Sequence, residues 1–548
     1  SLVAGITRRQ RAELEPREVT TLAQLAVQPL PLRPLFESMS DSAFEKIREQ
    51  ARIQLEGRVD KKHKYELFTD TEEGKGLSAL PEPSEGDIFF DIEGDPHAFI
   101  DGLEYLWGYV DVEGHFTGLW ALSPDEERTQ FEAFIDMVMQ RLETWPDLHI
   151  YHYAAYEQTA VKRLASRYAT RELEVDQLLR GEVFVDLYRV VRQGLRASVE
   201  SYSIKKMEPL YLFDREVDLR AANAALANFE AWLQLGGGEG AQSLLDDIEG
   251  YNKDDCVSTL RLRDWLEGLR TELSTMLDHE IPRAEAPDTE ASDSVQEENE
   301  RVQQLMDALL AGVSDDAALR SEEEEGKWLL AHLLSFHRRE KKSMWWEYFR
   351  LCDLEAEALV EDSKSMGGLE YIDVVDTVKR SLVHRYRFPH QDHGMRRSEG
   401  VRDPRTGKSP GTVVSVDEQA RTIDLKRGVT SKAPHPTALI PFDDVPDKLM
   451  RESLWRLADR VVAHGFDQVS NRAAVQLLLR RPPQLDEQAR GLLRRPGEEN
   501  LDTARRVSST LQGTVLPVQG PPGSGKTYIG ARMIVSLIAA GKRVGVTA

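Results

Sequence analysis

Residues 87–96 (DIFFDIEGDP) constrain the fold of this chain more than any other short stretch. An apolar run of this length predicts a buried strand, along which Asp91 and Glu93 point to the same face, about 7 Å apart. Two carboxylates on one face repel each other unless a cation lies between them, and hard divalent cations prefer oxygen ligands. The alternative is a solvated strand end, so a metal site requires further acidic residues on this face.

The region from residue 86 to residue 269 alternates between strand and helix patterns. Two strand-like runs flank the turn dipeptide Glu113-Gly114, which predicts a hairpin, and a helix and another strand follow (residues 105–112, 115–120, 125–141 and 149–153). Antiparallel strands followed by strands that are joined through helices predict an α/β layer with a mixed sheet.

Further acidic residues occur at element boundaries in this region. Glu157 falls in the first turn of a predicted helix, where an acid is also favoured by the helix dipole alone. Asp186 stands between a strand and a helix, which is typical of an N-cap. Tyr251 and Asp255 are four positions apart at the expected start of an amphipathic helix and therefore share one face. Asp254 can exchange roles with Asp255.

The D-x-E strand, the acid at a helix start and the Y-x3-D helix resemble the three motifs of the DEDD 3′–5′ exonucleases, which have an RNase H-like fold. This resemblance implies that two Mg²⁺ or Mn²⁺ ions are held by four carboxylates, and that Tyr251, as in the tyrosine-type branch, orients the attacking water. The implied metal ligands are Asp91, Glu93, Glu157 and Asp255. Two such ions clamp the attacking and leaving oxygens of an in-line phosphodiester displacement. The implied substrate is single-stranded DNA or RNA with a 3′ end.

One position departs from the family pattern. The family has Asp where this chain has Glu157, and Asn a few residues earlier, where this chain has Tyr153. Glu is one methylene longer than Asp and still reaches a metal, directly or through a water. Two classes of function therefore stay open: a metal-dependent 3′–5′ exonuclease, and a degenerate RNase H-like scaffold that binds nucleic acid without cleaving it.

A second motif lies near the end of the chain. Residues 514–518 are strand-like, a glycine-rich loop follows, and a helix is expected from Lys526. This context of strand, loop and helix is the one that the Walker A motif requires. Loop amides would cradle the phosphates of ATP, Lys526 would reach the β and γ phosphates, and Thr527 would supply a hydroxyl to Mg²⁺. The predicted nucleotide-binding residues are Gly520, Pro521, Pro522, Gly523, Ser524, Gly525, Lys526 and Thr527.

The GPPGSGKT form, preceded by a barrel-like segment and helices, resembles superfamily 1 helicases of the Upf-type group. The order of the segments is similar to that of bacterial RecB-like nuclease and helicase fusions. The resemblance implies an ATP-driven motor coupled to nucleases, with a RecB-type nuclease before Ser1. The chain begins without Met, ends 21 residues after Thr527 and finishes on a strand-like run, residues 543–547. Both ends therefore look cut, and we expect this length of chain to bind nucleotide poorly or not to hydrolyse it.

Composition and patterning, together with what these resemblances imply, predict a multidomain α/β protein with six parts. These are a helical adapter with weak helix-hairpin-helix character (1–84), an RNase H-like exonuclease domain (85–270), an acidic linker (271–300), a helical region (301–373), a β-barrel-like insertion (374–446) and the helices and Walker A start of a RecA-like domain (447–548). Basic and aromatic residues at 338–349 predict either base stacking or Trp packing in a core. The barrel-like part has a local excess of Arg and Lys, which favours a nucleic-acid path.

The overall charge and the cysteines exclude several classes of protein. With 70 basic and 94 acidic residues, the net charge of −24 argues against a basic nucleic-acid-coating protein, although a local basic channel stays compatible with it. The two cysteines, Cys256 and Cys352, lie in different regions, which argues against a disulfide framework and fits a reducing cytoplasm. The sequence has no signal-peptide pattern and no apolar run of 18 residues, so no membrane span is expected.

Overall fold

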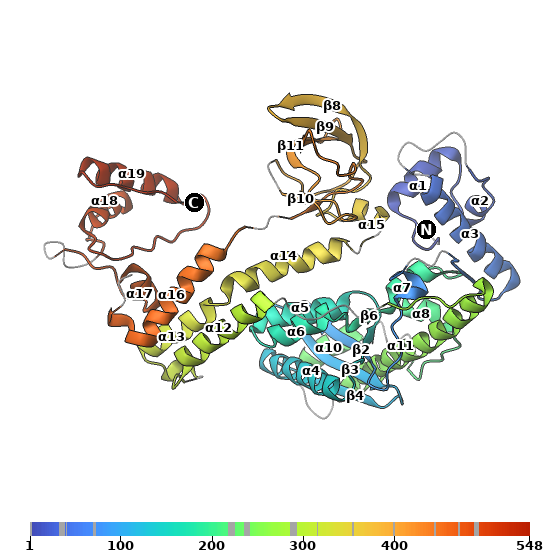
Figure 1. Cartoon of the computed structure of the whole chain (residues 1–548). Helices are drawn as coiled ribbons and strands as arrows, with labels where there is room; N and C mark the ends of the chain where they lie inside the picture. The colour runs from blue at the N-terminus through green and yellow to red at the C-terminus, as the bar shows by residue number, and fades with distance from the viewer. Residues whose placement is uncertain are drawn as a thin grey trace. The chain divides into compact units, whose positions relative to one another are not determined.

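A computed structural model describes residues 3–31, 39, 41–69, 73–217, 225–234, 242–284, 293–314, 316–352, 354, 356–397, 400–442, 445–468, 472–486 and 493–547. The chain divides into two compact units, residues 1–290 and residues 291–548 (Figure 1). No helix in the described part of the chain combines the length and the apolar character that crossing a bilayer requires.

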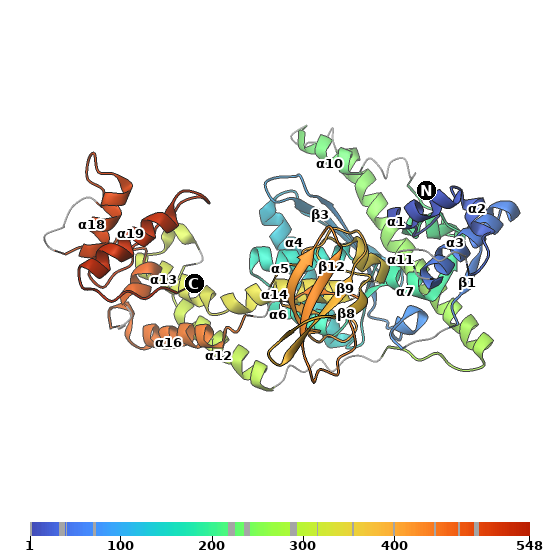
Figure 2. The same cartoon turned by 90° about the horizontal axis from the view of Figure 1, so that it is seen from above.

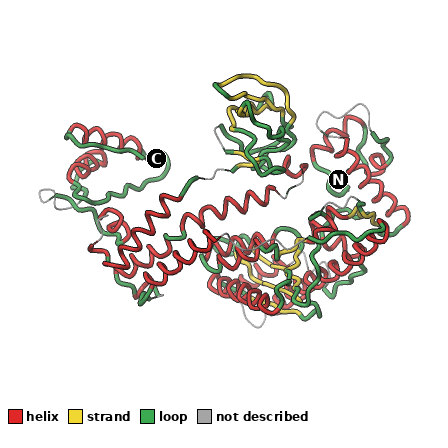
Figure 3. The backbone as a smooth tube through the Cα atoms, viewed as in Figure 1, coloured by secondary structure: helices red, strands yellow, loops and turns green. Residues whose placement is uncertain are grey.

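A five-stranded mixed sheet forms the middle of the N-terminal unit (Figure 3). Its order is β4-β3-β2-β5-β6, with bounds Phe116–Trp120, Leu103–Asp111, Ile88–Asp95, Ile150–His152 and Phe184–Asp186. The first three strands are antiparallel, whereas β5 runs parallel to both β2 and β6. The turn between β3 and β4 contains Gly114 with φ 84°, a backbone region that favours glycine. The predicted hairpin and the predicted mixed sheet are therefore confirmed.

Each face of the sheet has its own hydrophobic core, and alternation along β2 assigns side chains to the two cores. Ile88, Phe90 and Ile92 pack with α4 (Pro124–Thr144), α5 (Tyr156–Tyr168) and α6 (Glu172–Arg180). Phe89 packs on the other face with α7 (Leu187–Gly194) and α11 (Gln242–Leu277). Because side chains alternate, Asp91 and Glu93 share the face of Phe89, which is the face that α11 covers.

The long helix α11 begins earlier than predicted. We expected a helix start at Tyr251, but α11 begins at Gln242 and has 36 residues, so Tyr251 and Asp255 lie within it. The reason is tertiary packing: Leu245 and Ile248 are buried against Phe229 of α10 (Ala225–Gln234), which extends the helix towards its N-terminus. The helix ends at Leu277, and helix α12 begins at Asp293, so helical structure covers both ends of the range predicted as a linker.

Helices α1 (Arg8–Leu14), α2 (Leu22–Ala26) and α3 (Asp41–Asp60) precede the sheet and have a core of their own. Capping boxes that start at Thr7 and Thr21 fix the N-termini of α1 and α2. On α3, Gln50 Nε2 donates to the Ala197 carbonyl at 2.9 Å. Ala197 ends β7 (Leu195–Ala197), which pairs antiparallel with β1 (Tyr65–Leu67). The helical segment is therefore attached to the sheet domain by hydrogen bonds.

Four helices of the C-terminal unit share one hydrophobic core: α12 (Asp293–Leu310), α13 (Glu322–Leu333), α16 (Lys448–His464) and α17 (Arg472–Leu478). Helix α14 (Phe336–Cys352) contains most of the basic and aromatic run. Its Trp345 ring packs against Phe442 with 4.7 Å between ring centroids, and Tyr348 does so at 5.0 Å. These contacts support the packing alternative for Trp345, rather than base stacking.

A four-stranded antiparallel sheet forms the β part of the C-terminal unit (Figure 2). Its order is β11-β12-β9-β8, with bounds Thr412–Asp417, Thr422–Gly428, Ser381–Arg387 and Glu370–Val378. A second pair joins β10 (Val401–Arg402) to β13 (Ile440–Pro441), and helix α15 spans Ala356–Glu361. Tyr386, Ile423 and Leu425 form the centre of its core. Closure of these strands into a barrel stays a prediction.

The last part of the chain contains helices α18 (Asn500–Thr510) and α19 (Lys526–Ala539). Helix α19 begins at Lys526, as predicted. The two strands predicted at residues 514–518 and 543–547 were wrong, because both runs are irregular in the structure. A strand needs a neighbour for its ladder of hydrogen bonds, and neither run has one within the described residues. Val518 and Val546 are accordingly 52% and 76% exposed.

Candidate active site

Three carboxylates converge at the middle of β2. Asp91 and Glu93 come from this strand and Asp255 from α11, and each residue offers one ligand oxygen within 4.8 Å of the other two. Asp255 is 8% exposed, whereas Asp91 and Glu93 keep a partly exposed edge. This set of three carboxylates is called the carboxylate cluster below. Its all-oxygen donors fit a divalent cation such as Mg²⁺ or Mn²⁺.

Contacts along α11 fix the helix on the sheet. Asn252 Nδ2 donates to Asp91 Oδ2 at 2.8 Å, the Cys256 thiol donates to the Gly108 carbonyl at 3.2 Å, and Arg263 Nη1 donates to Asp87 Oδ2 at 2.9 Å. Asp87 is fully buried, so its charge needs this partner. These contacts place Asp255 beside Asp91.

Gly108 allows the helix to approach this closely. It lies opposite Asp91 in the pairing of β2 with β3. A Cβ atom at position 108 would lie 1.6 Å from Asn252 Oδ1, so a side chain there is incompatible with the observed position of Asn252. Asn252 is fully buried, and its Oδ1 makes no hydrogen bond within the described residues. Asn252 thus serves to hold the Asp91 carboxylate through its amide group.

Glu157 lies in the first turn of α5, as the sequence predicts, but it is not part of the carboxylate cluster. It is 4% exposed, and its Oε2 lies 3.4 Å from His152 Nδ1, which is hydrogen-bonded to the Ala154 carbonyl at 2.7 Å. Glu157 Oε2 makes no hydrogen bond within the described part of the chain. A buried oxygen without a donor is a site that a cation or a water can occupy.

The turn before α5 is held by Asp186. Ala154 adopts φ 74°, an unfavourable region for alanine, and its N–H donates to Asp186 Oδ1 at 2.8 Å. The same oxygen accepts from the Tyr188 N–H at 2.9 Å, which confirms Asp186 as the N-cap of α7. One carboxylate therefore connects the end of β6 with the turn that presents Glu157.

Two cations flank Tyr251. Lys205 Nζ lies 4.5 Å from the centroid of the Tyr251 ring, and the guanidinium carbon of Arg215 lies 5.4 Å from it. Lys205 belongs to α8 (Ile204–Met207), and Arg215 follows the short 3-10 helix η3 (Glu208–Leu210). Arg215 Nη2 also donates to Asp255 Oδ1 at 2.5 Å. Positive charge thus reaches the cluster from segments that precede α11.

The pKa values of the cluster report an excess of negative charge. Burial raises the pKa of Asp91 well above its ordinary value, and repulsion from Asp255, Glu93 and Glu157 raises it further. Burial and the Asp255 carboxylate raise the pKa of Glu93 to about 8, with Lys205 acting in the opposite direction. Burial likewise raises the pKa of Asp255, although Arg215 opposes the shift. Such carboxylates are stabilised in their charged form by a bound cation.

Residues 88–267 match the family model of the RNase_H superfamily. The matched range begins with β2 and includes the sheet, the cluster and most of α11, so this part of the chain is an RNase H-like domain. No curated protein matches the sequence. An RNase H-like domain with an acidic cluster is a nuclease-type scaffold, typically one that binds nucleic acid and uses divalent metal ions.

Sequence reasoning missed three residues of the RNase H-like domain that contact the cluster or act on it through their charge. Asn252 follows Tyr251 directly in the sequence. The signal that points to it is Gly108 in β3, because a glycine there leaves room for the Asn252 side chain. Lys205 and Arg215 carry no motif, because their role depends on how their segment folds back onto α11.

A pocket of about 270 Å³ adjoins Glu93. Its lining includes Asp95, Glu104, Tyr156 and Arg163. Tyr156 is 45% exposed and donates to Glu104 Oε2 at 2.9 Å, and Arg163 forms an ion pair with the same carboxylate. The pocket therefore presents an aromatic ring and polar groups next to the cluster.

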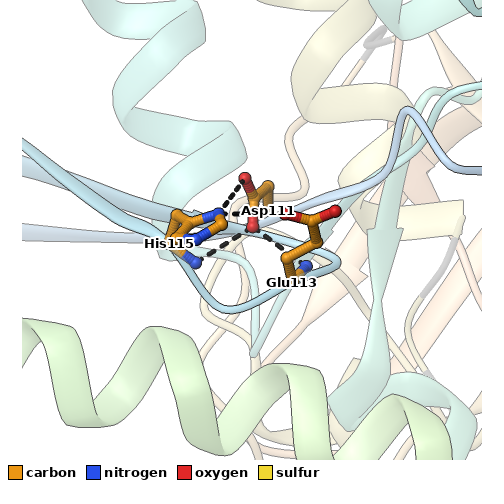
Figure 4. Close-up of side chains that lie close together, drawn as sticks. All are labelled: Asp111, Glu113 and His115. Carbon is orange, nitrogen blue, oxygen red and sulfur yellow. Dashed lines mark hydrogen bonds and ion pairs between the residues drawn. The ribbon is translucent and has the colours of Figure 1, made fainter.

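A second group of potential metal ligands lies in the turn between β3 and β4 (Figure 4). The Asp111 carboxylate accepts hydrogen bonds from the N–H groups of Glu113 and His115 at 2.9 and 3.0 Å. His115 Nδ1 lies 3.2 Å from Asp111 Oδ2. These contacts show that the three residues form a hydrogen-bonded network that fixes the turn of the hairpin. The network lies on an exposed surface.

The predicted Walker A loop has the local geometry of a loop that enters a helix. Gly523 and Gly525 adopt φ 79° and 83°, and α19 starts directly afterwards. Lys526 Nζ donates to the carbonyls of Gly520 and Pro521 at 2.5 and 2.8 Å. Residues 521–527 are all exposed. The ammonium group thus spans the mouth of the loop.

Proposed function

We propose that the RNase H-like domain is a divalent-metal-dependent nuclease that hydrolyses single-stranded DNA or RNA from the 3′ end. The convergence of Asp91, Glu93 and Asp255, whose raised pKa values indicate unbalanced negative charge, carries the proposal. The 3′ polarity rests on the resemblance to DEDD exonucleases.

Each residue of the site has its own role in the proposed reaction. When bound, Mg²⁺ or Mn²⁺ supplies Lewis-acid activation of the phosphodiester. Asp91, Glu93 and Asp255 hold the ion, and Asn252 fixes the orientation of Asp91 through its amide hydrogen bond. The Tyr251 hydroxyl orients the attacking water by a hydrogen bond. Glu157, in the first turn of α5, would add a further negative charge beside the ion and contact it directly or through a water.

The pocket beside Glu93 supports recognition of a chain end. A nucleobase can stack on the exposed Tyr156 ring, and stacking of this kind is tolerant of sequence. Arg163 at the rim is a donor for a phosphate or a sugar hydroxyl. The pocket of about 270 Å³ beside Glu93 offers room for part of a nucleotide next to the carboxylate cluster, which fits binding of a chain end.

The test uses 5′-labelled single-stranded DNA and RNA with Mg²⁺ or Mn²⁺. We expect a ladder that shortens from the 3′ end, its loss on chelation, and a loss of at least about a hundredfold in rate with Asp91→Ala. Asp111→Ala, in the turn network, is the matched control and should keep full activity. Activity that is equal in Asp91→Ala and the unchanged protein would contradict the proposal.

The alternative scaffold function follows from Glu157. If neither substrate shortens but both bind the domain, the site grips nucleic acid without cutting it. The substitution Glu157→Asp restores the residue of the DEDD pattern and discriminates the two functions. A gain of metal-dependent cleavage with this variant would favour a weakened nuclease over a scaffold that never cleaves.

A second candidate function is nucleotide binding by the Walker A loop, as part of a superfamily 1 helicase. The positive φ of Gly523 and Gly525 and the helix start at Lys526 favour it, because this geometry directs N–H groups towards a phosphate. In a version of the chain that contains the later helicase motifs, binding of a fluorescent ATP analogue should weaken at least about tenfold with Lys526→Ala. Equal binding by the variant would contradict a Walker A function.

A further inference from the structure

Lys205 presents a positive charge to the carboxylate cluster without being paired to a carboxylate. Its Nζ lies 4.5 Å from the centroid of the Tyr251 ring, a cation–π contact. The charge of Lys205 opposes the raised pKa values of Glu93 and Asp255, so the ammonium group lies within electrostatic reach of both. Among the described residues, no carboxylate lies within ion-pairing distance of Nζ. The half-buried ammonium group is therefore available to an anionic ligand.

Arg215, the other cation beside Tyr251, is already paired. Its Nε donates to both carboxylate oxygens of Glu208, at 2.9 and 3.0 Å, and its Nη2 donates to Asp255. Glu208 is buried, so its charge balances that of the guanidinium. Of the two cations, Lys205 is the one that can bind a group of the substrate.

The segment that carries Lys205 is fixed on both sides. Helix α8 ends at Met207, which is fully buried in the core beside α11. Before the helix, the Tyr202 hydroxyl donates to Gln50 Oε1 at 2.8 Å, and the Tyr202 carbonyl accepts from the Tyr153 hydroxyl. The backbone at Lys205 therefore needs little reordering when a ligand binds, which lowers the entropic cost of binding.

The proposed reaction needs a cation of this kind. A bond forms between the water oxygen and phosphorus, the bond to the 3′ oxygen of the preceding nucleotide breaks, the water gives up a proton and the leaving oxygen takes one up. Negative charge stays on the non-bridging oxygens, and an ammonium group with three N–H donors can bind one of them. Cleavage from the 3′ end leaves this phosphate on the 5′ oxygen of the released nucleotide.

We propose that Lys205 is the phosphate-binding residue of the nuclease site, and that its ammonium group binds a non-bridging oxygen of the phosphate under attack. A nucleoside 5′-monophosphate, the product of cleavage from the 3′ end, is therefore a ligand of the site. The inference rests on the proposed nuclease function. It assigns the cation to the three carboxylates of the cluster and the phosphate to Lys205.

The experiment measures by calorimetry how the whole chain, with saturating Mn²⁺, binds thymidine, uridine and their 5′-monophosphates. We expect Lys205→Ala to weaken binding of at least one monophosphate about tenfold or more, and to leave binding of the nucleosides within about twofold. Lys205→Arg, which keeps a cationic donor, should retain most of the affinity. Lys206→Ala removes the same charge from the exposed neighbouring position and is the matched control. Cleavage of a labelled strand by Lys205→Ala should show a fall in kcat larger than the change in KM.

The outcomes separate the inference from the proposed function. If Lys205→Ala binds both monophosphates as tightly as the unchanged protein, or if the unchanged protein binds neither, the inference is overturned, whereas cleavage that depends on Asp91 would leave the nuclease function intact. A changed affinity for Mn²⁺, with the same preference for monophosphate over nucleoside, would mean that Lys205 only neutralises the carboxylates, and would also overturn the inference. If cleavage is equal in Asp91→Ala but monophosphate binding still depends on Lys205, the nuclease function fails and the phosphate site stands. Circular dichroism checks the fold, and Lys205→Met, which keeps the apolar stem on the Tyr251 ring, decides the matter if Lys205→Ala unfolds.

Discussion

The carboxylate cluster and the predicted Walker A loop are built in opposite ways. The cluster assembles Asp91, Glu93 and Asp255 from a strand and a helix that are far apart in the sequence, and it is packed against a core. The loop is one contiguous run of residues, and all of its residues from 521 to 527 are exposed. A convergent site depends on the fold around it, whereas a contiguous loop depends mainly on its own backbone. The two regions should therefore respond differently to substitution.

The largest effect on stability is expected for Gly108→Ala. The new Cβ would lie 1.6 Å from Asn252 Oδ1, so α11 must shift or Asn252 must leave Asp91. Overpacking of this kind costs about 1–3 kcal/mol, and we expect a weaker affinity for Mn²⁺ as well. Chemical denaturation and calorimetry measure both quantities.

Gly268→Ala on the same helix is the matched control. A Cβ at this exposed helical position would meet nothing within 4 Å beyond the helix's own neighbouring backbone in the described part of the chain, so alanine should stabilise the chain by about 0.5–1 kcal/mol. Equal effects of the two substitutions would mean that the approach of α11 to β3 does not limit the site.

Asp91→Asn should have a smaller effect, of the opposite sign. In the absence of metal, the substitution removes a buried charge that is repelled by Asp255, Glu93 and Glu157, so the variant should be more stable by roughly 1 kcal/mol. Thermal melts with EDTA measure this gain. With saturating Mn²⁺ the order should reverse, since only the unchanged protein is stabilised by the ion. A variant that is less stable in EDTA would argue against repulsion in the cluster.

The free energy of unfolding should depend on pH because of the same burial and repulsion of carboxylates. Glu93 has an ordinary pKa of 4.5 and a folded pKa of about 8, raised by burial and Asp255. A raised acid pKa favours the folded state when the group is protonated, so this contribution is present below pH 4.5 and is lost as the pH rises to 8. Melts of the metal-free protein, compared with Glu93→Gln, isolate the contribution of Glu93. If stability changes with pH equally in Glu93→Gln and in the unchanged protein, the pH dependence comes from other groups.

The smallest effect on stability belongs to the loop. Lys526 is exposed, and its bonds among the described residues are to loop carbonyls, so Lys526→Ala should change the free energy of unfolding by less than about 0.5 kcal/mol. Urea denaturation measures it. A loss as large as that of Gly108→Ala would remove the contrast between the two regions.

Much of the RNase H-like domain could be predicted from local patterns. The strand with Asp91 and Glu93, the hairpin at Gly114, the helix start near Glu157 and the N-cap at Asp186 each follow from signals within a few residues. Sequence periodicity and turn chemistry act at this range, which explains why these predictions were confirmed.

The failures have tertiary causes. The start of α11 depends on burial against Phe229 of α10, and the irregular runs beside the predicted Walker A loop have no neighbouring strand among the described residues. The cationic side of the cluster depends on how Lys205 and Arg215 fold back onto α11. In each case, the residues that make the contact are distant in the sequence from the residues that they affect.

The contact between Gly108 and Asn252 has a consequence for divergence. The two positions are distant in sequence but cannot drift independently: a larger residue on the strand is tolerated only if the helix residue shrinks. Such a change would also release Asp91 from its amide partner. Among related sequences, the two positions should therefore covary, and pairs that break the rule should mark lineages in which the carboxylate cluster has decayed.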